Sequence, residues 1–372
     1  MTKMHLRNDI ARSRGISRRD FLKLATAGLL AGCRPTRQTS APTHTPTPAP
    51  THTPTPEPPA TSAARPVVTV PRSEIIKIYP DAPSKVVHTH HTGVWDGETL
   101  APEIVRQMLD ASIAQLTGLN DAREAWAVLF DPDERIAIKV STIRTSDYWT
   151  HVPLVMAVTE CLQDVGIPPE QIVIFDRADH ELTAAGYTIN QDEPGVRCYE
   201  TTDYVEGWTL LDTDIRLSDI LLNCDALINM PILKHHSHSG VTFAMKNLFG
   251  VFNKPASFHR PRTGQAIAEL NALSPIRERT RLIIGDMLEV CPISRHGWFE
   301  AVLGDSILTS FDPVAHDAVG FQWLSQVMTT QEYDTVAAAA EELAIPWLAT
   351  SAELGLGTND SDNMELMEVN LG

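Results

Sequence analysis

The chain has 372 residues, of which 43% are hydrophobic, and its formal net charge is −17 at pH 7. A chain of this length and apolar content can bury a core, which excludes disorder throughout. The acidic charge argues against nucleic acid as a partner. Since no run of about eighteen apolar residues occurs, we also expect no ordinary membrane-spanning helix.

The first 32 residues differ from the rest of the chain because they are basic. Ser17–Lys23 reads SRRDFLK and resembles a twin-arginine export signal through Arg18 and Arg19. A short apolar stretch follows and ends in LAGC at Cys33, which resembles a lipobox whose cysteine receives a diacylglycerol. We therefore expect residues 1–32 to be a signal peptide read by the twin-arginine export machinery. We also expect Cys33 to anchor the exported protein to the outer face of the cytoplasmic membrane, in the cell envelope.

The next segment, residues 33–66, is rich in threonine and proline. PTHTPTPA at residues 42–49 is followed directly by PTHTPTPE at residues 50–57. Such a sequence has almost no apolar side chains and few backbone donors, so it cannot form a core. We expect a lipidated cysteine followed by a disordered stalk, and a globular domain over residues 67–372.

Short apolar strands alternate with amphipathic helices through this globular part. In chain order, the expected strands are 73–79, 85–90, 135–140, 171–175, 226–230, 282–285 and 307–310. The expected helices are 102–119, 122–129, 151–165, 264–273, 312–328 and 335–343, with Asp312 as an N-cap. This alternation predicts an α/β fold with a mostly parallel central sheet and helices on both faces. No linker-like stretch interrupts it, so one lobe and two lobes both remain open.

Polar residues gather where these strands end, which is where open α/β sheets bind ligands. Lys139 lies near the end of one strand, Asp176 follows the next, and Asp286 follows a third. The densest polar run is a loop within ILKHHSHSGVTFAMKNLFGVF, residues 232–252. It supplies the remaining candidates, namely Lys234, His235, His238, Lys246 and Asn247.

Two site chemistries fit these residues. His235, His238 and Asp176 have the donor atoms of a divalent metal site. Alternatively, Lys139, Lys234, Lys246 and Asn247 would bind a small anion such as phosphate or a carboxylate. In either case Asp176, His235 and Asp286 are the candidates for catalytic acid–base work.

The cysteines argue against two further cofactors. After Cys33, four cysteines remain, and no pair has the C-x-x-C spacing of a zinc or iron–sulfur site; they are Cys161, Cys198, Cys224 and Cys291. We expect no iron–sulfur cluster. An even number permits disulfides in an exported protein, but the apolar surroundings of Cys161 and Cys224 favour buried free thiols.

Several segments occur together in the order of a known family. They are IKV at residues 138–140, QIVIFDR at 171–177, CDALINMPILKHHSHSGVTFAMKNLFGVFNKP at 224–255 and DPVAHDAVG at 312–320. Over residues 101–328 the chain resembles the domain of unknown function 362 family. The resemblance implies an α/β domain and no assigned reaction. Some relatives carry ferredoxin-like cysteine clusters that this chain lacks, and relatives often have asparagine where this chain has Ser141.

Two kinds of function therefore remain open. One is an exported, lipid-anchored enzyme with a metal- or anion-binding site at the strand ends. The other is a non-catalytic solute-binding or assembly lipoprotein, since a stalk, an anchor and an acidic domain suit that role equally well. A redox accessory role is suggested only by the relatives with cysteine clusters, and the cysteine spacing of this chain counts against it.

Overall fold

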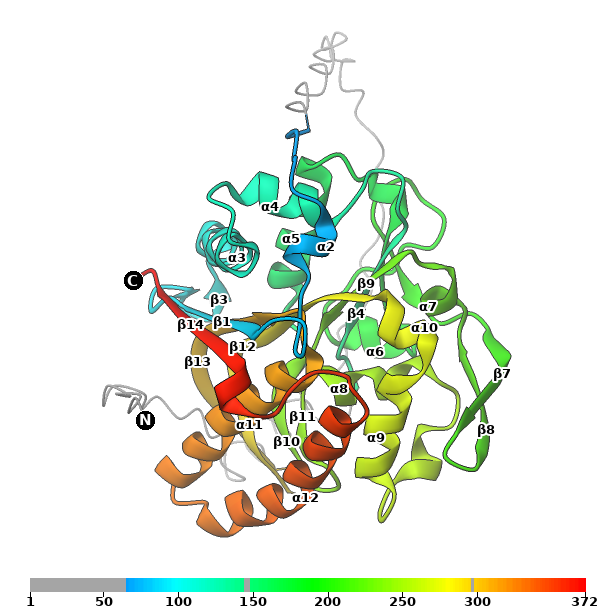
Figure 1. Ribbon diagram of the computed structural model, residues 1–372, viewed down its shortest axis with the longest axis vertical. Coiled ribbons are helices and arrows are strands. Elements are labelled where there is room, and N and C mark those ends of the chain that lie inside the picture. Colours follow the sequence, from blue (N-terminus) through cyan, green and yellow to red (C-terminus); the bar gives the residue numbers. More distant parts are fainter. Residues whose placement is uncertain (1–64, 144–147, 296–297) are drawn as a thin grey trace, which may run out of the picture. The chain divides into compact units, whose positions relative to one another are not determined.

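A ten-stranded sheet forms the centre of the computed structural model, which describes residues 65–143, 148–295 and 298–372 (Figure 1). The export-signal residues Arg18 and Arg19 and the lipidation candidate Cys33 lie outside these residues. The strands of the main path, in spatial order, are β14 (Met364–Asn370), β1 (Ser84–His90), β13 (Trp298–Ser310), β12 (Thr280–Arg295), β9 (Ala226–Met230), β4 (Ile136–Val140), β5 (Ile172–Asp176) and β6 (Arg197–Glu200). Off this path, β10 (Ile232–His236) pairs with β12 and with β11 (Gly240–Thr242).

Most strand pairs of this sheet are parallel. The pairs β12–β9, β9–β4, β4–β5 and β5–β6 are parallel, as are β1–β14 and β10–β12. The long strand β13 is antiparallel to both β1 and β12, and β11 is antiparallel to β10. The predicted α/β class with a mostly parallel sheet is therefore confirmed.

Helices cover both faces of the sheet because the strands are apolar on both sides. Ala137 and Leu227 pack into one hydrophobic cluster, whereas the next residues, Ile138 and Ile228, pack into the other. One face carries α3 (Pro102–Thr117), α4 (Ala122–Leu129) and α5 (Val152–Asp164). The other carries α8 (Ala244–Asn247), α9 (Thr263–Ala272), α11 (Pro313–Thr330) and α12 (Asp334–Glu353), and Figure 1 shows the two groups on either side of the sheet. Together the described residues belong to one compact unit.

The remaining elements are short and lie around this frame. The helical ones are α2 (Arg72–Ile75), α6 (Asp179–Ala184), α7 (Asp219–Asn223) and α10 (Ser274–Arg279), with the 3-10 turns η1 (Pro169–Gln171), η2 (Leu248–Val251), η3 (Pro255–Phe258) and η4 (Ser361–Asn363). The strands are β2 (Trp95–Asp96), β3 (Thr99–Leu100), β7 (Tyr204–Leu210) and β8 (Thr213–Ser218). No described helix is both long and apolar enough to cross a membrane.

Most expected elements are present, and two expectations are wrong. The strand expected at 73–79 is the short helix α2 and an irregular segment, because its isoleucines pack onto the core without pairing with the sheet. The loop expected after residue 232 is largely a hairpin, since β10 runs to His236 and β11 begins at Gly240. The Asp312 N-cap is confirmed, because its side chain accepts hydrogen bonds from the backbone N–H groups of Val314 and Ala315.

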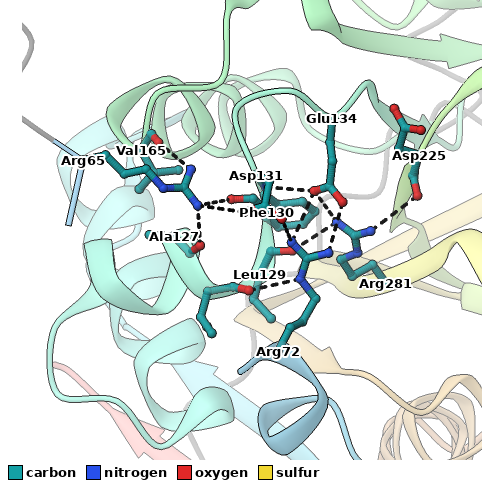
Figure 2. A network of polar contacts seen from close by, with 11 residues as sticks. Arg65, Arg72, Ala127, Leu129, Phe130, Asp131, Glu134, Val165, Asp225 and Arg281 are labelled. Atoms are coloured by element: carbon teal, nitrogen blue, oxygen red, sulfur yellow. Dashed lines mark hydrogen bonds and ion pairs between the residues drawn. The ribbon is translucent and has the colours of Figure 1, made fainter. Parts of the chain in front are cut away.

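A network of arginines and carboxylates ties the beginning of the domain to the edge where the central strands start (Figure 2). Arg72 forms ion pairs with Asp131, at 2.6 Å, and Glu134, at 3.0 Å. Arg281 pairs with the same Glu134 at 2.6 Å, and Arg65 contacts Asp131 at 3.3 Å. The segment from Arg65 is thereby attached at the amino ends of β4 and β12.

The four described cysteines, Cys161, Cys198, Cys224 and Cys291, are buried, and no disulfide joins any two of them. The expectation of buried thiols at Cys161 and Cys224 is confirmed. Burial raises the pKa of each of these two thiols above its ordinary value, to about 12 at Cys224. These thiols are therefore protonated and unreactive at neutral pH.

Candidate functional site

Lys139 and Asp176 form a buried ion pair at the carboxyl ends of two neighbouring parallel strands, β4 and β5. Lys139 Nζ lies 2.7 Å from Asp176 Oδ1 and also donates to the carbonyl oxygen of Val140 at 2.6 Å. The other carboxylate oxygen, Oδ2, accepts two hydrogen bonds of 2.8 Å, from the backbone N–H and the hydroxyl of Thr142. The Arg177 N–H donates to Oδ1 at 2.8 Å. Asp176 is therefore fully occupied in holding Lys139 and the ends of both strands.

The backbone at Gly250, in η2, approaches this pair too closely for any side chain. A Cβ atom at this position would lie 2.8 Å from both Asp176 Oδ1 and Lys139 Nζ. Real Cβ contacts are essentially never that short. Glycine is therefore required here by close approach, and η2 covers the ion pair.

Two asparagines connect the ion pair to its neighbours. Lys139 Nζ lies 3.4 Å from Asn247 Oδ1, and Asn247 Nδ2 donates to Asn229 Oδ1 at 2.8 Å. Asn229 Nδ2 in turn donates to the Ala244 carbonyl oxygen at 2.8 Å. This chain of hydrogen bonds fixes β4, β9 and α8 relative to one another.

The buried Asp317 of α11 holds the start of the short helix α8. Its Oδ1 accepts a hydrogen bond of 2.8 Å from Ala244 N, and its Oδ2 accepts one of 2.9 Å from Met245 N. The ring of His316 lies 3.0 Å from the same carboxylate and 3.1 Å from the carbonyl oxygen of Leu308. Since the next two residues of α8 are Lys246 and Asn247, Asp317 sets the position of both candidate ligands.

Lys246 and Lys234 complete a cluster of buried cations beside the ion pair. The Lys246 ammonium lies 3.5 Å above the centre of the Phe249 ring. Burial, together with the charges of Lys234 and Arg177, lowers its pKa to about 7. Burial likewise lowers the pKa of Lys234 to about 8, and its ammonium donates to the Tyr148 carbonyl oxygen at 3.2 Å.

Among the described residues, Lys246 has no carboxylate within 4.0 Å of its ammonium. Its contact with Phe249 is therefore a cation–π interaction without an ionic partner. This is unusual for a buried lysine, because buried charges are ordinarily paired.

Three imidazoles lie close to one another and near Lys246. The rings of His236 and His238 have centroids 5.6 Å apart, and those of His238 and His259 are 5.0 Å apart. Burial lowers the pKa of each ring, and the positive charge of Lys246 lowers it further. The three rings are thus neutral at pH 7 and add polar groups without charge.

The expected metal ligands are not brought together. Within the described ranges, no group of three or more His, Cys, Asp or Glu side chains is placed to hold a metal ion. His235 is buried on β10, where strand alternation directs it to the face opposite Lys234 and His236. Asp176, as described above, is occupied by Lys139 and Thr142.

Asp286 does not join the lysine cluster directly but forms a pair with His151. His151 Nδ1 lies 2.8 Å from Asp286 Oδ2, and the His151 backbone N–H donates to the same oxygen at 2.8 Å. Burial lowers the pKa of His151, but the charge of Asp286 and their hydrogen bond, with Glu289, outweigh burial and raise it. The ring of Trp95 packs edge-on against the imidazole, with centroids 5.5 Å apart.

The structure brings five of the sequence-predicted candidates together. Lys139, Asp176, Lys234, Lys246 and Asn247 all lie at one cluster, as expected from their positions after strands. Sequence reasoning does not single out Asn229, Gly250 or Asp317, which hold these residues in place, or His151, which pairs with Asp286. The sequence does indicate a role for Asn229, because it is a polar residue inside the apolar, buried strand ALINM.

Comparison with known proteins identifies one family. Residues 136–322 match the sequence pattern of the family described as "Domain of unknown function (DUF362)". No protein with a curated description matches the chain. The matched range contains the whole lysine cluster together with His151, Asp286 and Asp317.

Two solved structures are similar to the chain at low identity. One is a structural-genomics crystal structure of a protein from Thermotoga maritima, with 10% identity, a TM-score of 0.36, and coverage of 67% of this chain and 61% of that one. The other is the lactate racemase apoprotein from Thermoanaerobacterium thermosaccharolyticum, with 9% identity, a TM-score of 0.40, and coverage of 64% and 57%. The chain spans less than two thirds of the length of either protein.

Proposed function

The chain belongs to the DUF362 family, and we propose that it is an enzyme that binds a small anionic substrate at the cluster of Lys139, Lys234 and Lys246. The observation that carries this proposal is the buried Lys246 ammonium, which has an aromatic ring but no described carboxylate beside it. An ionic partner from solution would supply the missing negative charge.

The charge balance of the cluster supports an anion. A buried charge is costly unless it is paired and hydrogen-bonded. The Asp176 carboxylate already pairs with Lys139 at 2.7 Å and accepts hydrogen bonds from Thr142 and Arg177. Lys246 instead feels the positive charges of Lys234 and Arg177, which would be relieved by a phosphate or carboxylate ligand.

The altered lysine pKa values support catalysis rather than simple retention of a solute. Lysines with pKa values of about 7 and about 8 exist in both protonation states near neutral pH. Such groups can donate or accept a proton during a reaction as well as hold an anion. We therefore assign Lys246 and Lys234 as substrate anchors that are also able to transfer protons.

Calorimetric titration of the purified protein tests this proposal. Inorganic phosphate and pyruvate serve as separate probes, because they represent the two anion classes. We expect at least one to bind the wild type, and Lys246→Met to weaken that binding about tenfold or more, which corresponds to about 1.4 kcal/mol. Lys77→Met, which removes an exposed lysine paired with Glu74, is the matched control and should bind normally.

Two results would contradict the proposal. The first is that neither anion binds the wild type between pH 6 and pH 8, a range that spans the lowered pKa of Lys246 of about 7. The second is that K246M and the wild type bind with equal affinity, which would leave the buried ammonium without a role in recognition.

We also propose that the protein is exported through its Arg18–Arg19 signal and anchored by a lipid on Cys33. The SRRDFLK and LAGC sequences support this proposal. Radioactive palmitate fed to cells should label the wild type and the Cys161→Ala control, but not Cys33→Ala. Replacement of both arginines by lysine should leave an uncleaved precursor in the cytoplasm, and normal processing of that variant would rule out this route.

A further inference from the structure

A second reactive feature lies next to the lysine cluster. A cavity of about 340 Å³ is lined by Tyr148, Thr150, His151, Ile232 and Glu289, among others. His151 reaches it from the start of α5, while its partner Asp286 comes from β12 and is completely buried. The cavity therefore has an imidazole in its wall and a carboxylate behind that imidazole.

We propose that His151 is the proton-transfer residue of this cavity, with Asp286 as the positioning residue behind it. This inference rests on the proposed function, because it assigns the proton carrier for the anion that the lysines bind. The ligand would be a small phosphate or carboxylate compound with an acidic O–H or C–H group that extends from the lysines into the cavity.

The hydrogen bonds of the pair fix the imidazole for this task. Asp286 Oδ2 accepts from both the backbone N–H and Nδ1 of His151, at 2.8 Å each, while Leu288 N–H donates to Oδ1 at 3.1 Å. An ionised carboxylate only accepts hydrogen bonds, so neutral His151 carries its proton on Nδ1. Nε2 is then left as the proton acceptor, and it makes no hydrogen bond to another described residue.

The charges around His151 raise its proton affinity. Asp286 and Glu289 are the carboxylates that face it, and their charges favour the imidazolium against burial. The phenol of Tyr187 lies near the same carboxylate, donates to the Thr150 carbonyl oxygen at 2.8 Å, and has its pKa raised by burial. It therefore stays neutral while His151 titrates.

The cavity wall is attached to the lysine cluster. Lys234 donates to the Tyr148 carbonyl oxygen at 3.2 Å. The Thr150 hydroxyl accepts a hydrogen bond from Ser141 N and donates one to the Met230 carbonyl oxygen.

In the proposed step, a proton leaves the bound anion and forms a bond to Nε2 of His151. Asp286 stays ionised, and the additional negative charge on the substrate is stabilised by the lysines.

The pair is tested by NMR on histidine labelled with ¹³C at Cε1 and with ¹⁵N in the ring. In the anion-free wild type we expect neutral His151 to be protonated at Nδ1 and its pKa to lie above the ordinary value of about 6.5. Asp286→Asn should lower this pKa, and His151→Asn identifies the signal. If D286N does not fold, the tautomer in the wild type decides the question alone, because a proton on Nε2 would overturn the proposal.

Contact with the ligand is tested by adding phosphate or pyruvate to the same sample. Saturation should shift the His151 signal and leave that of the exposed His180 unchanged. H151N should keep anion affinity within about threefold of wild type, since the lysines supply the binding energy. An unchanged His151 signal with bound anion would overturn this inference and leave the proposed function intact. Absence of any anion binding would overturn the proposed function, while the tautomer still decides the role of the pair.

Discussion

The Lys139 ammonium lies 2.7 Å from Asp176 Oδ1, at a point where the exposed fractions of the two side chains are only 1% and 5%. Because β4 and β5 are adjacent parallel strands, this pair lies between their carboxyl ends. Its carboxylate and that of the buried Glu181, which pairs with Arg177, are negative charges that act on Lys139. The pair therefore links the two strands, and its carboxylate reduces the net positive charge of the lysine cluster.

Removal of one member of this pair should be strongly destabilising. In Lys139→Met the Asp176 carboxylate stays buried without its ionic partner, and breaking such a pair typically costs about 3–5 kcal/mol. Urea unfolding measures the loss in free energy of unfolding. The exposed pair of Lys77 and Glu74 is the control, and Lys77→Met should change stability very little. Equal effects of the two substitutions would contradict the structural role of the buried pair.

Gly250→Ala should disturb the site because the added methyl group collides with the Lys139–Asp176 ion pair. Its Cβ would lie 2.8 Å from Asp176 Oδ1 and Lys139 Nζ, so the pair must move apart or η2 must move outward. We expect a loss of about 1–3 kcal/mol in the free energy of unfolding and weaker phosphate binding. Gly97→Ala adds a Cβ in open space at a positive φ, so it should lower stability without changing anion affinity.

Asp317→Asn should weaken anion binding although Asp317 touches no ligand. The amide cannot accept hydrogen bonds at both positions, so the N–H groups of Ala244 and Met245 lose one acceptor and α8 shifts with Lys246. A loss of about 2 kcal/mol in stability is expected for such a cap. Asp312→Asn removes a comparable cap at the start of α11, so it should lower stability while anion affinity changes less.

Anion affinity should fall as the pH rises from 7 to 9. An anion binds the protonated lysines, so binding weakens as Lys246, with a pKa of about 7, and then Lys234, with a pKa of about 8, lose their protons. Calorimetry in buffers of different ionisation enthalpy should also detect proton uptake on binding at pH 8. An affinity that is constant or rises over this range would contradict the role of both lysines.

Lys246→Met should stabilise the protein at neutral pH while it weakens anion binding. Because folding lowers the pKa of Lys246 from 10.5 to about 7, the unfolded chain binds more protons between these values, and wild-type stability rises with pH there. The gain from Met is therefore fully present below pH 7, on the order of 5 kcal/mol, and shrinks toward pH 10.5. Urea unfolding in an anion-poor buffer measures it, and a gain that grows with pH would be inconsistent with a buried charged lysine.

Local patterns in the sequence predict much of the fold. The helices α3 and α4 and the strand β9 follow from apolar periodicity and from flanking residues such as Pro102. The hairpin of β10 and β11 escapes prediction because its residues KHHSHSG are polar and lack the alternation of an amphipathic strand. The edge strand β14, MELMEVN, is not predicted either, because the adjacent apolar residues Leu366 and Met367 break the alternation of a half-buried strand.

Prediction of the site stops where contacts span long distances in sequence. Lys139 and Asp176 are found because their positions after two strands place them at one edge of the sheet. His151 and Asp286 are 135 residues apart, and Asp317 is 73 residues from Ala244. No local sequence pattern predicts such long-range pairs, because their members come together only when the sheet folds.

The arginine network of Figure 2 has a mechanical consequence. A force applied to the chain before Arg65 would act on the ion pairs that Arg65 and Arg72 form with Asp131 and Glu134. These ion pairs lie at the amino ends of β4 and β12. Lys139 and Asp176 stand roughly 15 Å away, at the far end of the five-residue strand β4. Such a force would act on these ion pairs first, so Lys139 and Asp176 would keep their geometry while the chain is under tension.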